Sequence, residues 1–430
     1  MKMATIFAQA TAAGRAGVSV VRISGPAALD VSTKLAGSLP PSHQAALRTI
    51  RGEEGEVIDR ALVLPFHGPN SFTGEDVVEL HLHGSIAVVD SVLKLLGRFP
   101  DTRLAEAGEF TRRALENERL DLAQVEGLAD LIDAETEAQR KQALRVLSGH
   151  LGDLVEGWRS DLIRAAALLE ATIDFADEEV PVDVTPEVTA LLSGVTQDLV
   201  KEVEGSKVAE RIRQGFEVAI IGAPNAGKST LLNALAGRDA AITSEIAGTT
   251  RDIVEVRMDL EGLPVTLLDT AGLRESDDVV ETIGVERAIS RARSSDLRIF
   301  LAYQDEELML APVEGDIIVH PKADMFPDQP NAISGKTGAG IAELVSKVTD
   351  ELKSRSLAAG VATHERHRVA FASALDRLKA AQDIVGRSSE FYDIASEELR
   401  SAVRAMESVV GRIGVEDLLD EIFSSFCIGK

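Results

Sequence analysis

Cysteine and aromatic residues are scarce in this 430-residue chain, and each scarcity excludes something. The single cysteine, Cys427, excludes an internal disulfide framework and a cysteine-based zinc cluster. Aromatic residues make up 4% of the chain against 45% hydrophobic residues, which favours aliphatic, helix-rich packing. No apolar run approaches the ~18 residues of a membrane span, and the N-terminus lacks a basic-then-apolar export signal. We therefore expect a soluble, cytoplasmic protein with no membrane partner.

Positive charge is also in deficit. The chain carries 70 acidic and 45 basic residues, which gives a net charge of −25. This balance argues against broad, non-specific binding of nucleic acid, because such binding depends on neutralising phosphates. It leaves room for local basic faces, each of which is more often a solvated helix face than a binding patch. The candidates are Arg112-Arg113 with Arg119, the cluster Arg140-Lys141-Arg145, and the series Arg287, Arg291, Arg293 and Arg298.

The first hundred residues have the pattern of a compact α+β domain. Strands are predicted at residues 5–10, 18–23, 57–65 and 77–83, separated by turn-forming glycine, proline and asparagine. A helix is predicted at residues 86–96, where apolar residues recur on one side. Strands joined by both short turns and helices indicate a mixed sheet with helices to one side.

From Ala107 the apolar residues follow a helical period. Leu122, Val125, Ala129 and Ile132 form one stripe, and residues 135–176 continue the period with few breakers. An acidic, proline-marked linker at 177–183 precedes a further predicted helix at 186–213. Helical patterns return after Ala359, at 366–385, 397–410 and 415–425.

Between these helical stretches the pattern changes to that of an α/β unit, so we expect one helical domain with an α/β domain inserted into it. The predicted limits are 1–118 for the N-terminal α+β domain and 119–213 for the first helical part. They are 214–358 for the inserted Ras-like phosphate-loop GTPase domain and 359–430 for the second helical part.

The inserted unit opens with a phosphate-binding loop. An apolar run at 216–221 leads into Gly222-Ala-Pro-Asn-Ala-Gly227-Lys228-Ser229, which fits G-x-x-x-x-G-K-[ST], and leucines follow at helical spacing. Glycines let backbone N–H groups surround an anion, and the helix N-terminus adds partial positive charge. Lys228 is expected to reach the β- and γ-phosphates, and the Ser229 hydroxyl to ligate Mg²⁺.

Two further motifs follow in the order that a GTPase requires. Ala247-Gly-Thr249-Thr250-Arg251-Asp252 lies in a polar loop before a strand, where a threonine can complete the Mg²⁺ shell and order a switch. Asp269-Thr-Ala-Gly272 ends the next strand and matches the D-x-x-G signature. Asp269 is expected to hold Mg²⁺ through water, and the Gly272 N–H to contact the γ-phosphate.

The base-recognition motif departs from the usual pattern. Pro321-Lys322-Ala323-Asp324 stands where GTPases have N-K-x-D, and Ser334-Gly335-Lys336 matches the loop that backs the base. Lys322 can cover the base, and Asp324 can accept two guanine N–H donors that adenine does not offer. Pro321 removes one side-chain donor, which predicts guanine binding with weakened affinity. The alternative is a site degraded below useful affinity.

Three segments of the inserted unit, GAPNAGKST, GTTRD and DTAGLRESDDVVETIGVERA, resemble the tRNA-modification GTPase family known as MnmE or TrmE. Leu273 follows D-x-x-G, so the water-positioning glutamine of Ras-like enzymes is absent. The resemblance implies instead that Asn225 and the backbone of 244–249 hold K⁺ and that Glu281 orients the attacking water. By itself, Glu281 would be interpreted as a solvent-facing residue at a helix start.

The resemblance implies nucleotide contacts in each motif, with Lys228 and Glu281 as the catalytic residues. The phosphate-side contacts are Asn225, Ala226, Gly227, Lys228, Ser229, Thr230, Ser244, Glu245, Ile246, Ala247, Gly248, Thr249, Thr250, Asp269, Thr270, Ala271 and Gly272. The base-side contacts are Lys322, Asp324, Ser334, Gly335 and Lys336. The implied metal ligands are Ser229 and Thr250, together with Asn225, Ser244, Ile246 and Thr249.

Both ends of the chain resemble the same family. The terminus Cys427-Ile-Gly-Lys430 matches its C-x-G-K ending, whereas Gly-Lys does not fit a prenylation box. A frayed tail with a lone thiol is the other interpretation, and the role of Cys427 stays open. The N-terminal segments that resemble the family are GVSVVRISG, SFTGED, VELHLHG and GEFTRRA, at 17–25, 71–76, 78–84 and 108–114.

The N-terminal resemblance implies a tetrahydrofolate-binding domain that also mediates homodimerisation. The implied contacts are Arg22 for the glutamate tail and Glu79 for the pterin. Arg119 stands where the family usually has lysine, so charge is kept but geometry differs, and Lys430 lies in the terminus near the pocket. His81 and His83 alternate on a strand without a third ligand, which argues against zinc.

The function that the resemblance implies is addition of an aminomethyl-type group to C5 of the tRNA wobble uridine. It implies GTP, Mg²⁺, K⁺ and 5,10-methylene-tetrahydrofolate, or a 5-formyl analogue, as cofactors. The implied partners are a second copy of the chain, a flavin-dependent GidA or MnmG protein in a heterotetramer, and tRNA. The alternatives are a ribosome-assembly or signalling GTPase switch, which shares the phosphate-loop motifs, and a protein that binds nucleotide without turnover.

Overall fold

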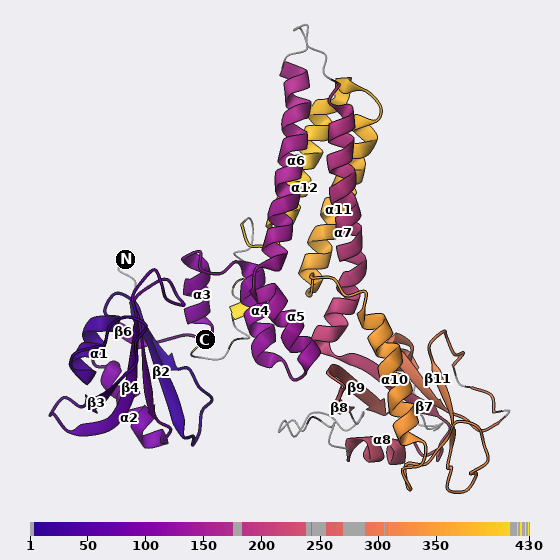
Figure 1. Cartoon of the computed structure of the whole chain (residues 1–430), viewed down its shortest axis with the longest axis horizontal. Coiled ribbons are helices and arrows are strands. Elements are labelled where there is room, and N and C mark those ends of the chain that lie inside the picture. Colours follow the sequence, from indigo (N-terminus) through magenta and orange to yellow (C-terminus); the bar gives the residue numbers. More distant parts are fainter. Residues whose placement is uncertain are drawn as a thin grey trace, which may run out of the picture. The chain divides into compact units, whose positions relative to one another are not determined.

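The computed structural model of the chain describes residues 4–174, 183–237, 242, 255–269, 289–304, 306–308 and 310–412, and residues 419, 422, 423, 426 and 429. These form two compact units (Figure 1). The N-terminal unit comprises Met1–Ala129 and Glu407–Lys430, and the large unit comprises Asp130–Met406. The domain limits given above stay predictions.

The N-terminal unit is built on a six-stranded sheet in the order β3-β4-β5-β2-β1-β6. Neighbouring strands are antiparallel except for β1 and β6, which are parallel, so the sheet is mixed as predicted. The strands are β1 (Thr5–Gln9), β2 (Val18–Ser24), β3 (Ala46–Arg51), β4 (Val57–Phe66), β5 (Val77–His83) and β6 (Thr102–Leu104).

Two helices, α1 (Ala28–Ala36) and α2 (Ile86–Leu96), pack against one face of this sheet. Strand β5 shows why the helices cover this face: Val78, Leu80 and Leu82 alternate along the strand, point to the helices and are fully buried. Glu79 and His81, the residues between them, point to the other face. The polar residues of interest therefore lie on the side of the sheet that α1 and α2 leave free.

Helix α3 (Glu109–Glu116) is held to this sheet by a buried ion network. The Arg113 guanidinium donates to Glu75 at 3.0 Å and to Glu109 at 3.0 Å, and its side chain is 4% exposed. Ser24 donates to Glu75 at 2.7 Å, and Arg103 binds both oxygens of Glu109. Arg113 is thus neither a solvated face nor a binding patch, and both interpretations offered from the sequence are wrong for this residue.

The C-terminal residues of the N-terminal unit pack close to α4 (Leu122–Asp133). Phe423 and Phe426 form a cluster with Val125, and Leu115 and Leu120 lie at its edge. A Cβ atom at Gly108 would lie 2.9 Å from the Phe423 ring, so only glycine fits there. This region anchors the end of the chain to the N-terminal unit.

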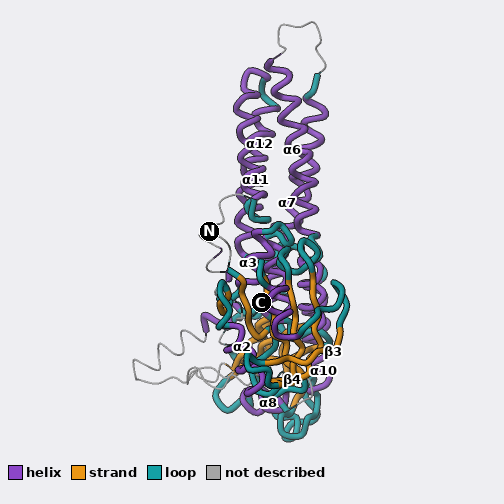
Figure 2. The backbone as a smooth tube through the Cα atoms, turned by 90° about the vertical axis from the view of Figure 1, so that its left-hand side faces the viewer, coloured by secondary structure: helices purple, strands orange, loops and turns teal. Residues whose placement is uncertain are grey.

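In the large unit, helices α6 (His150–Asp174), α7 (Thr185–Gln214), α11 (Glu365–Val385) and α12 (Tyr392–Glu407) lie side by side as a bundle (Figures 1 and 2). Trp158 of α6 meets Phe371 of α11 edge-on, with ring centroids 5.4 Å apart. Ser396 of α12 donates to Glu170 of α6 at 2.8 Å. No described helix is long and apolar enough to cross a membrane.

One predicted helical stretch is interrupted. The sequence predicted a nearly continuous period from 135 to 176, but α5 (Glu137–Leu147) and α6 are separate helices. Gly149, with a φ of 90°, stands between them in the left-handed region that favours glycine. The predicted linker at 177–182 and most of the predicted helix at 415–425 lie outside the described residues.

The inserted domain is a second six-stranded sheet in the order β12-β11-β10-β7-β9-β8, parallel except for the β8–β9 pair. Helices α8 (Lys228–Ala236) and α10 (Ile341–Ser356) contribute to its core. The strands are β7 (Phe216–Gly222), β8 (Glu255–Leu260), β9 (Leu263–Asp269), β10 (Leu297–Leu301), β11 (Ile317–Pro321) and β12 (Ala332–Ile333).

The two connections of the inserted domain to the bundle lie side by side. Arg213, in the last turn of α7 before the domain begins, donates to the carbonyl oxygen of Thr363 at 3.2 Å, and Thr363 leads into α11. Such close termini allow a domain to be inserted without disturbing its host. An α/β domain inserted into a helical domain is therefore what the structure contains.

Candidate functional site

The phosphate loop joins β7 to α8 and occupies the carboxyl edge of the parallel sheet, where open α/β sheets bind ligands. Gly227 caps α8 with a φ of 103°, and Asn225 has a φ of 63°. A Cβ atom at Gly222 would lie 2.6 Å from the Leu301 carbonyl oxygen, so the strand end admits only glycine. The shape of the phosphate loop is therefore set by backbone conformations that favour glycine or asparagine at these positions.

Lys228 lies folded over this loop. Its Nζ donates to the carbonyl oxygens of Gly222 at 2.7 Å and Ala223 at 2.9 Å, and the residue is 7% exposed. Burial lowers the pKa of the ammonium from its ordinary value, and the Asp269 carboxylate opposes that shift. Hydrogen bonds from an ammonium to charged phosphate oxygens are stronger than those to neutral carbonyl oxygens. Phosphate oxygens can therefore replace the two carbonyl partners of Lys228.

Ser229 and Asp269 are brought together by the pairing of β7 with β9. The Ser229 hydroxyl donates to Asp269 Oδ2 at 2.9 Å, and Asp269 is buried at the end of β9. A hydroxyl oxygen and a carboxylate oxygen side by side are the hard donors that Mg²⁺ prefers. The residues present therefore fit a magnesium site.

The base-side residues surround a cavity of about 260 Å³ beside the phosphate loop. The Ser334 hydroxyl donates to Asp324 Oδ1 at 2.8 Å, and the Ala323 N–H donates to Ile333 at 2.9 Å. These two bonds close the recognition loop between β11 and β12. The residues that line the cavity are Asn225, Ala226, Gly227, Thr230, Leu231, Leu301, Pro321, Lys322, Asp324, Met325, Ile333, Ser334, Gly335 and Lys336.

Asp324 is held in its ionised form. The hydrogen bond from Ser334 lowers the pKa of its carboxyl group, weak desolvation opposes this, and Lys336 and Lys322 add to the lowering. Asp324 therefore stays ionised at neutral pH as a pure acceptor. Lys322 has a φ of 59°, and its Nζ lies 5.8 Å from the centre of the Tyr303 ring.

Several residues assigned from the sequence lie outside the described part of the chain. They are Ser244, Glu245, Ile246, Ala247, Gly248, Thr249, Thr250, Thr270, Ala271, Gly272, Glu281, Cys427 and Lys430. Their assigned roles stay predictions.

A second cluster lies on the free face of the N-terminal sheet. Arg22 of β2 and Glu79 of β5 are register partners, and the guanidinium contacts Glu79 Oε1 at 3.0 Å. Phe72 and Phe110 lie on either side, with ring centres 5.3 and 5.6 Å from the guanidinium carbon. His81 Nε2 lies 3.3 Å from Glu79 Oε2, within hydrogen-bond distance of the same carboxylate.

Arg119 is exposed and packs with the loop around Gly74, where an added Cβ atom would lie 3.3 Å from its Cγ. At the other end of the chain, Gly429 approaches the backbone of Gln9 so closely that an added Cβ atom would lie 2.1 Å from its carbonyl oxygen. Gln9 ends β1, the strand that pairs with β2 beside Arg22. Gly429 of the terminal motif therefore lies against the sheet that carries Arg22 and Glu79.

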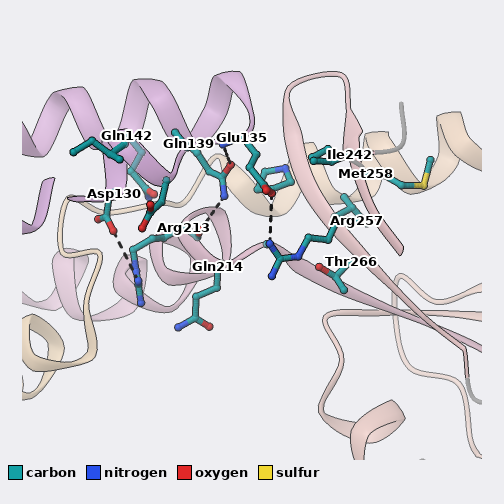
Figure 3. Close-up of a pocket in the computed structure, with 16 residues that line it drawn as sticks. Asp130, Glu135, Gln139, Gln142, Arg213, Gln214, Ile242, Arg257, Met258 and Thr266 are labelled. Carbon is teal, nitrogen blue, oxygen red and sulfur yellow. Dashed lines mark hydrogen bonds and ion pairs between the residues drawn. The ribbon is translucent and has the colours of Figure 1, made fainter. Parts of the chain in front are cut away.

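A third group of residues was not found from the sequence. A cavity of about 560 Å³ opens between the start of α5, the end of α7 and the β8–β9 hairpin (Figure 3). Arg257 faces Glu135 at 3.7 Å, and Gln139 donates to the Arg213 carbonyl oxygen at 2.9 Å. Ile132, expected in a buried stripe, is 39% exposed and lines this cavity, which corrects that expectation.

One signal could have found part of this cavity. Thr136-x-x-Gln139 is a capping box, in which Gln139 Oε1 accepts from the Thr136 N–H at 3.0 Å. It marks the start of α5, but nothing local in the sequence marks what packs there. The Ala138 N–H donates to Gly262 of the β8–β9 turn at 2.9 Å, a contact between distant segments.

A strand–phosphate loop–helix unit with a serine–aspartate pair and an aspartate-bearing base cavity, inserted into a helical bundle, defines a phosphate-loop GTPase carried by a helical domain. Two protein-family models match the chain, one for its N-terminal part and one for the rest. "GTP-binding protein TrmE N-terminus" matches residues 5–119, and "MnmE helical domain" matches residues 122–427. The chain belongs to the MnmE family of tRNA modification GTPases.

Relatives of full length agree with this assignment. The "tRNA modification GTPase MnmE" of Roseobacter denitrificans is 65% identical over 428 residues, covering 100% of both chains. Proteins of the same name from Ruegeria sp. and Ruegeria pomeroyi are 60% and 61% identical, again over 100% of both chains. This chain is a GTP-binding enzyme that hydrolyses GTP and acts in tRNA modification, and the ribosome-assembly, signalling and binding-only alternatives are not supported.

Proposed function

We propose that this GTPase is activated by K⁺ and acts with a flavin-dependent GidA- or MnmG-type partner on the tRNA wobble uridine. A tetrahydrofolate derivative supplies the one-carbon unit for a 5-aminomethyl or 5-carboxymethylaminomethyl group. The observation that carries the nucleotide half is the trio Lys228, Ser229 and Asp269, which gathers a cation, a hydroxyl and a carboxylate at one loop. The remaining assignments extend from it.

In this proposal each phosphate-side residue has one task. Lys228 exchanges its carbonyl partners for β- and γ-phosphate oxygens. Ser229 and Thr250 would hold Mg²⁺, with Asp269 contacting it through water, and the ion would supply positive charge for phosphoryl transfer. The backbone N–H groups of 225–230 and 270–272 surround the phosphates, and Glu281 orients the attacking water.

Asn225 and the backbone of Ser244, Ile246 and Thr249 would bind K⁺. The Asn225 side chain is exposed at the rim of the loop, where its amide oxygen is free to meet a cation. A monovalent cation at this place would supply the positive charge that other GTPases obtain from an arginine. The backbone of Glu245, Ala247 and Gly248 would complete the switch segment.

The folate half rests on Arg22 and Glu79. A guanidinium suits the glutamate tail of a folate, and a carboxylate suits the N–H donors of a pterin, while the partly exposed Phe72 beside Arg22 offers a face for ring contact. Arg119 adds a cation near the same loop, and Lys430 follows Gly429 beside β1. The ligand would be 5,10-methylene-tetrahydrofolate or a 5-formyl analogue.

The proposed assembly follows from charge and from the family. The N-terminal domain would pair with a second copy, and two copies of the flavin-dependent partner would complete a heterotetramer in the cytoplasm. With a net charge of −25, this chain is poorly suited to cover tRNA phosphates alone. The partner would therefore supply much of the tRNA-binding surface.

The test is GTP hydrolysis by the full chain in K⁺ and in Na⁺ at equal ionic strength. We expect at least about a tenfold lower rate in Na⁺, because removing one charge-stabilising group from a phosphoryl-transfer site costs about 10²–10³ in rate. Asn225→Ala should be equally slow in both salts. Asn233→Ala, an exposed asparagine of α8, is the matched control and should keep the K⁺ response.

Equal rates in K⁺ and Na⁺ for the native chain would contradict the cation assignment. Glu281→Ala should retain GTP binding and lose most turnover, and unchanged hydrolysis would remove Glu281 from its assigned role.

A further inference from the structure

The base cavity offers different partners to the two edges of guanine. The Watson–Crick edge carries the N1–H and 2-amino donors, whereas N7 and O6 are acceptors on the opposite edge. Asp324 is ionised and can only accept, so it suits the donor edge. N7 belongs to the five-membered ring that also carries the ribose, so it lies on the phosphate-loop side of a base oriented in this way.

Pro321 forms the wall on that side. It ends β11, pairs in register with Ile333, and is buried in the lining of the cavity. Proline has neither a backbone N–H nor a side-chain donor. Its carbonyl oxygen lies 2.9 Å from His320 Nδ1. The neighbouring lining residues Ala226 and Leu301 are apolar. Asn225 also lines the cavity, but its amide is assigned to K⁺ in the proposed function, so proline at 321 removes the donor to N7 that asparagine would supply there.

Asp324, the acceptor for the Watson–Crick edge, is held in place by Ser334. The Ser334 hydroxyl donates to Asp324 Oδ1 and accepts from the N–H groups of Lys336 and Thr337, each at 3.3 Å. Ser334 is 1% exposed, so its hydroxyl is shielded from solvent. The orientation of Asp324 is therefore set by the position of the 334–336 loop.

Gly335 sets the position of that loop. An added Cβ atom would lie 2.7 Å from both the carbonyl carbon and oxygen of Thr230, and 2.8 Å from the Leu231 nitrogen. These are backbone atoms of the first turn of α8, which cannot move aside as a flexible side chain would. Any side chain at 335 would lift the loop from α8 and carry Ser334 away from Asp324.

We propose that this site recognises guanine through its Watson–Crick edge alone, leaves N7 without a partner, and depends on Gly335 to position Ser334 and Asp324. The inference rests on the proposed function, in which guanine occupies this cavity. Such a site would bind guanine nucleotides weakly but still select guanine over other bases. A contact to N7 would be common to all purines, so its absence weakens binding while guanine is still distinguished from bases that lack the 2-amino group.

The test measures dissociation constants of the full chain for GDP, 7-deaza-GDP and IDP, which lacks the 2-amino group. We expect 7-deaza-GDP to bind within about twofold of GDP. IDP should bind at least about tenfold more weakly, because one oxygen of a charged acceptor loses its donor. Pro321→Asn should tighten GDP binding about fivefold or more without tightening 7-deaza-GDP binding, since the new amide has N7 as its only target.

Gly335→Ala should reduce the preference for GDP over IDP to about twofold or less, a change that general loss of stability does not produce. Ser334→Ala should give the same loss of preference and replaces Gly335→Ala if that variant fails to fold. Gly194→Ala, where the added Cβ meets no atom within 4 Å, is the matched control and should keep the native preference.

Weaker binding of 7-deaza-GDP by fivefold or more in the native chain would overturn the inference, as would an unchanged GDP preference in both Gly335→Ala and Ser334→Ala. Asp324→Ala separates this from failure of the proposed function. If that variant binds GDP as the native chain does, guanine does not occupy this cavity and the proposed site is wrong. If it loses the GDP preference, the cavity assignment stands and the other variants decide the inference.

Discussion

At the scale of single residues, Lys228 shows how the phosphate loop is prepared for an anion. Its ammonium is buried and bonded to two neutral carbonyl oxygens, and burial lowers its pKa. Phosphate oxygens would replace these partners by charged ones, and hydrogen bonds to charged groups contribute about 1.5–3 kcal/mol each. Lys228 is therefore expected to make a large contribution to the affinity for the triphosphate.

We predict that Lys228→Ala lowers GTP affinity at least about 100-fold, which is close to the loss of one or two such bonds. Titration with a fluorescent GTP analogue measures it. Lys353→Ala is the control, because Lys353 pairs with Glu261 and its side chain is 46% exposed. A Lys228→Ala variant that binds GTP within fivefold of the native chain would refute the role of the ammonium.

Glu109 makes the N-terminal unit sensitive to acid. Burial raises the pKa of its carboxyl group, but hydrogen bonds from Arg103, the Glu106 N–H and Arg113 outweigh burial and bring the pKa below the ordinary value of 4.5. A carboxyl group with a lowered folded-state pKa adds stability above its unfolded-state pKa. That stability is lost as the pH falls below about 4.5 toward the folded-state value.

We predict that the N-terminal unit loses free energy of unfolding between pH 5 and pH 3, as followed by denaturant unfolding at several pH values. Glu109→Gln should be less stable at neutral pH and should lose less on acidification, since no proton is taken up there. Glu53→Gln, an exposed residue of the same unit, should follow the native curve. Parallel curves for Glu109→Gln and the native chain would disprove the assignment.

At the scale of elements, the start of α5 joins three parts of the large unit. Gln139 closes the capping box with Thr136 and donates to the Arg213 carbonyl oxygen at the end of α7. The Ala138 N–H binds Gly262 in the β8–β9 turn. One helix terminus therefore links the bundle to the edge hairpin of the nucleotide domain.

We predict that Gln139→Ala destabilises the large unit by about 1–2 kcal/mol, the combined effect of a lost cap and a lost hydrogen bond. Equilibrium unfolding in urea measures it. Lys141→Ala, in the same helix with a side chain that is 70% exposed, should change stability by less than about 0.5 kcal/mol. A neutral Gln139→Ala would show that the interface does not depend on this side chain.

Strongly periodic or well-buried elements could be predicted from the sequence, and weakly patterned ones could not. Helix α2 has the predicted bounds, and β5 has the predicted ones as well. Helix α1 was missed because nine residues give little periodic signal and depend on packing for stability. Strands β3 and β6 were missed because each lies at an edge of the sheet, where β3 buries only Ile50 fully and β6 buries nothing.

The same distinction applies to the sites. Ser334 and Asp324 were each assigned to the base site from a sequence motif, and the structure shows in addition that they are in contact. The cavity beside α5 could not be predicted, because it arises where distant segments meet. Arg298 was interpreted as surface charge, but it is 7% exposed and pairs with Asp316 at 2.8 Å, so that interpretation was wrong. Partners so distant in sequence leave no local pattern.

At the scale of the whole molecule, the nucleotide domain is inserted through two adjacent connections, where Arg213 at the end of α7 binds Thr363 before α11. Its edge hairpin also rests on α5, so movements of β8 and β9 have a direct route to the bundle. The N-terminal unit carries the Arg22–Glu79 pair and the end of the chain. GTP hydrolysis and one-carbon chemistry are thus assigned to different parts of one polypeptide.

The central claim is that both parts serve one modification, and mass spectrometry of wobble-uridine nucleosides tests it most directly. The tRNA comes from cells that lack this gene and carry the native, Lys228→Ala, Arg22→Ala or Lys353→Ala chain. The account predicts that the 5-aminomethyl-type nucleoside is restored by the native and Lys353→Ala chains and by neither of the others. Restoration by Lys228→Ala or Arg22→Ala, or retention of the nucleoside without the gene, would contradict it.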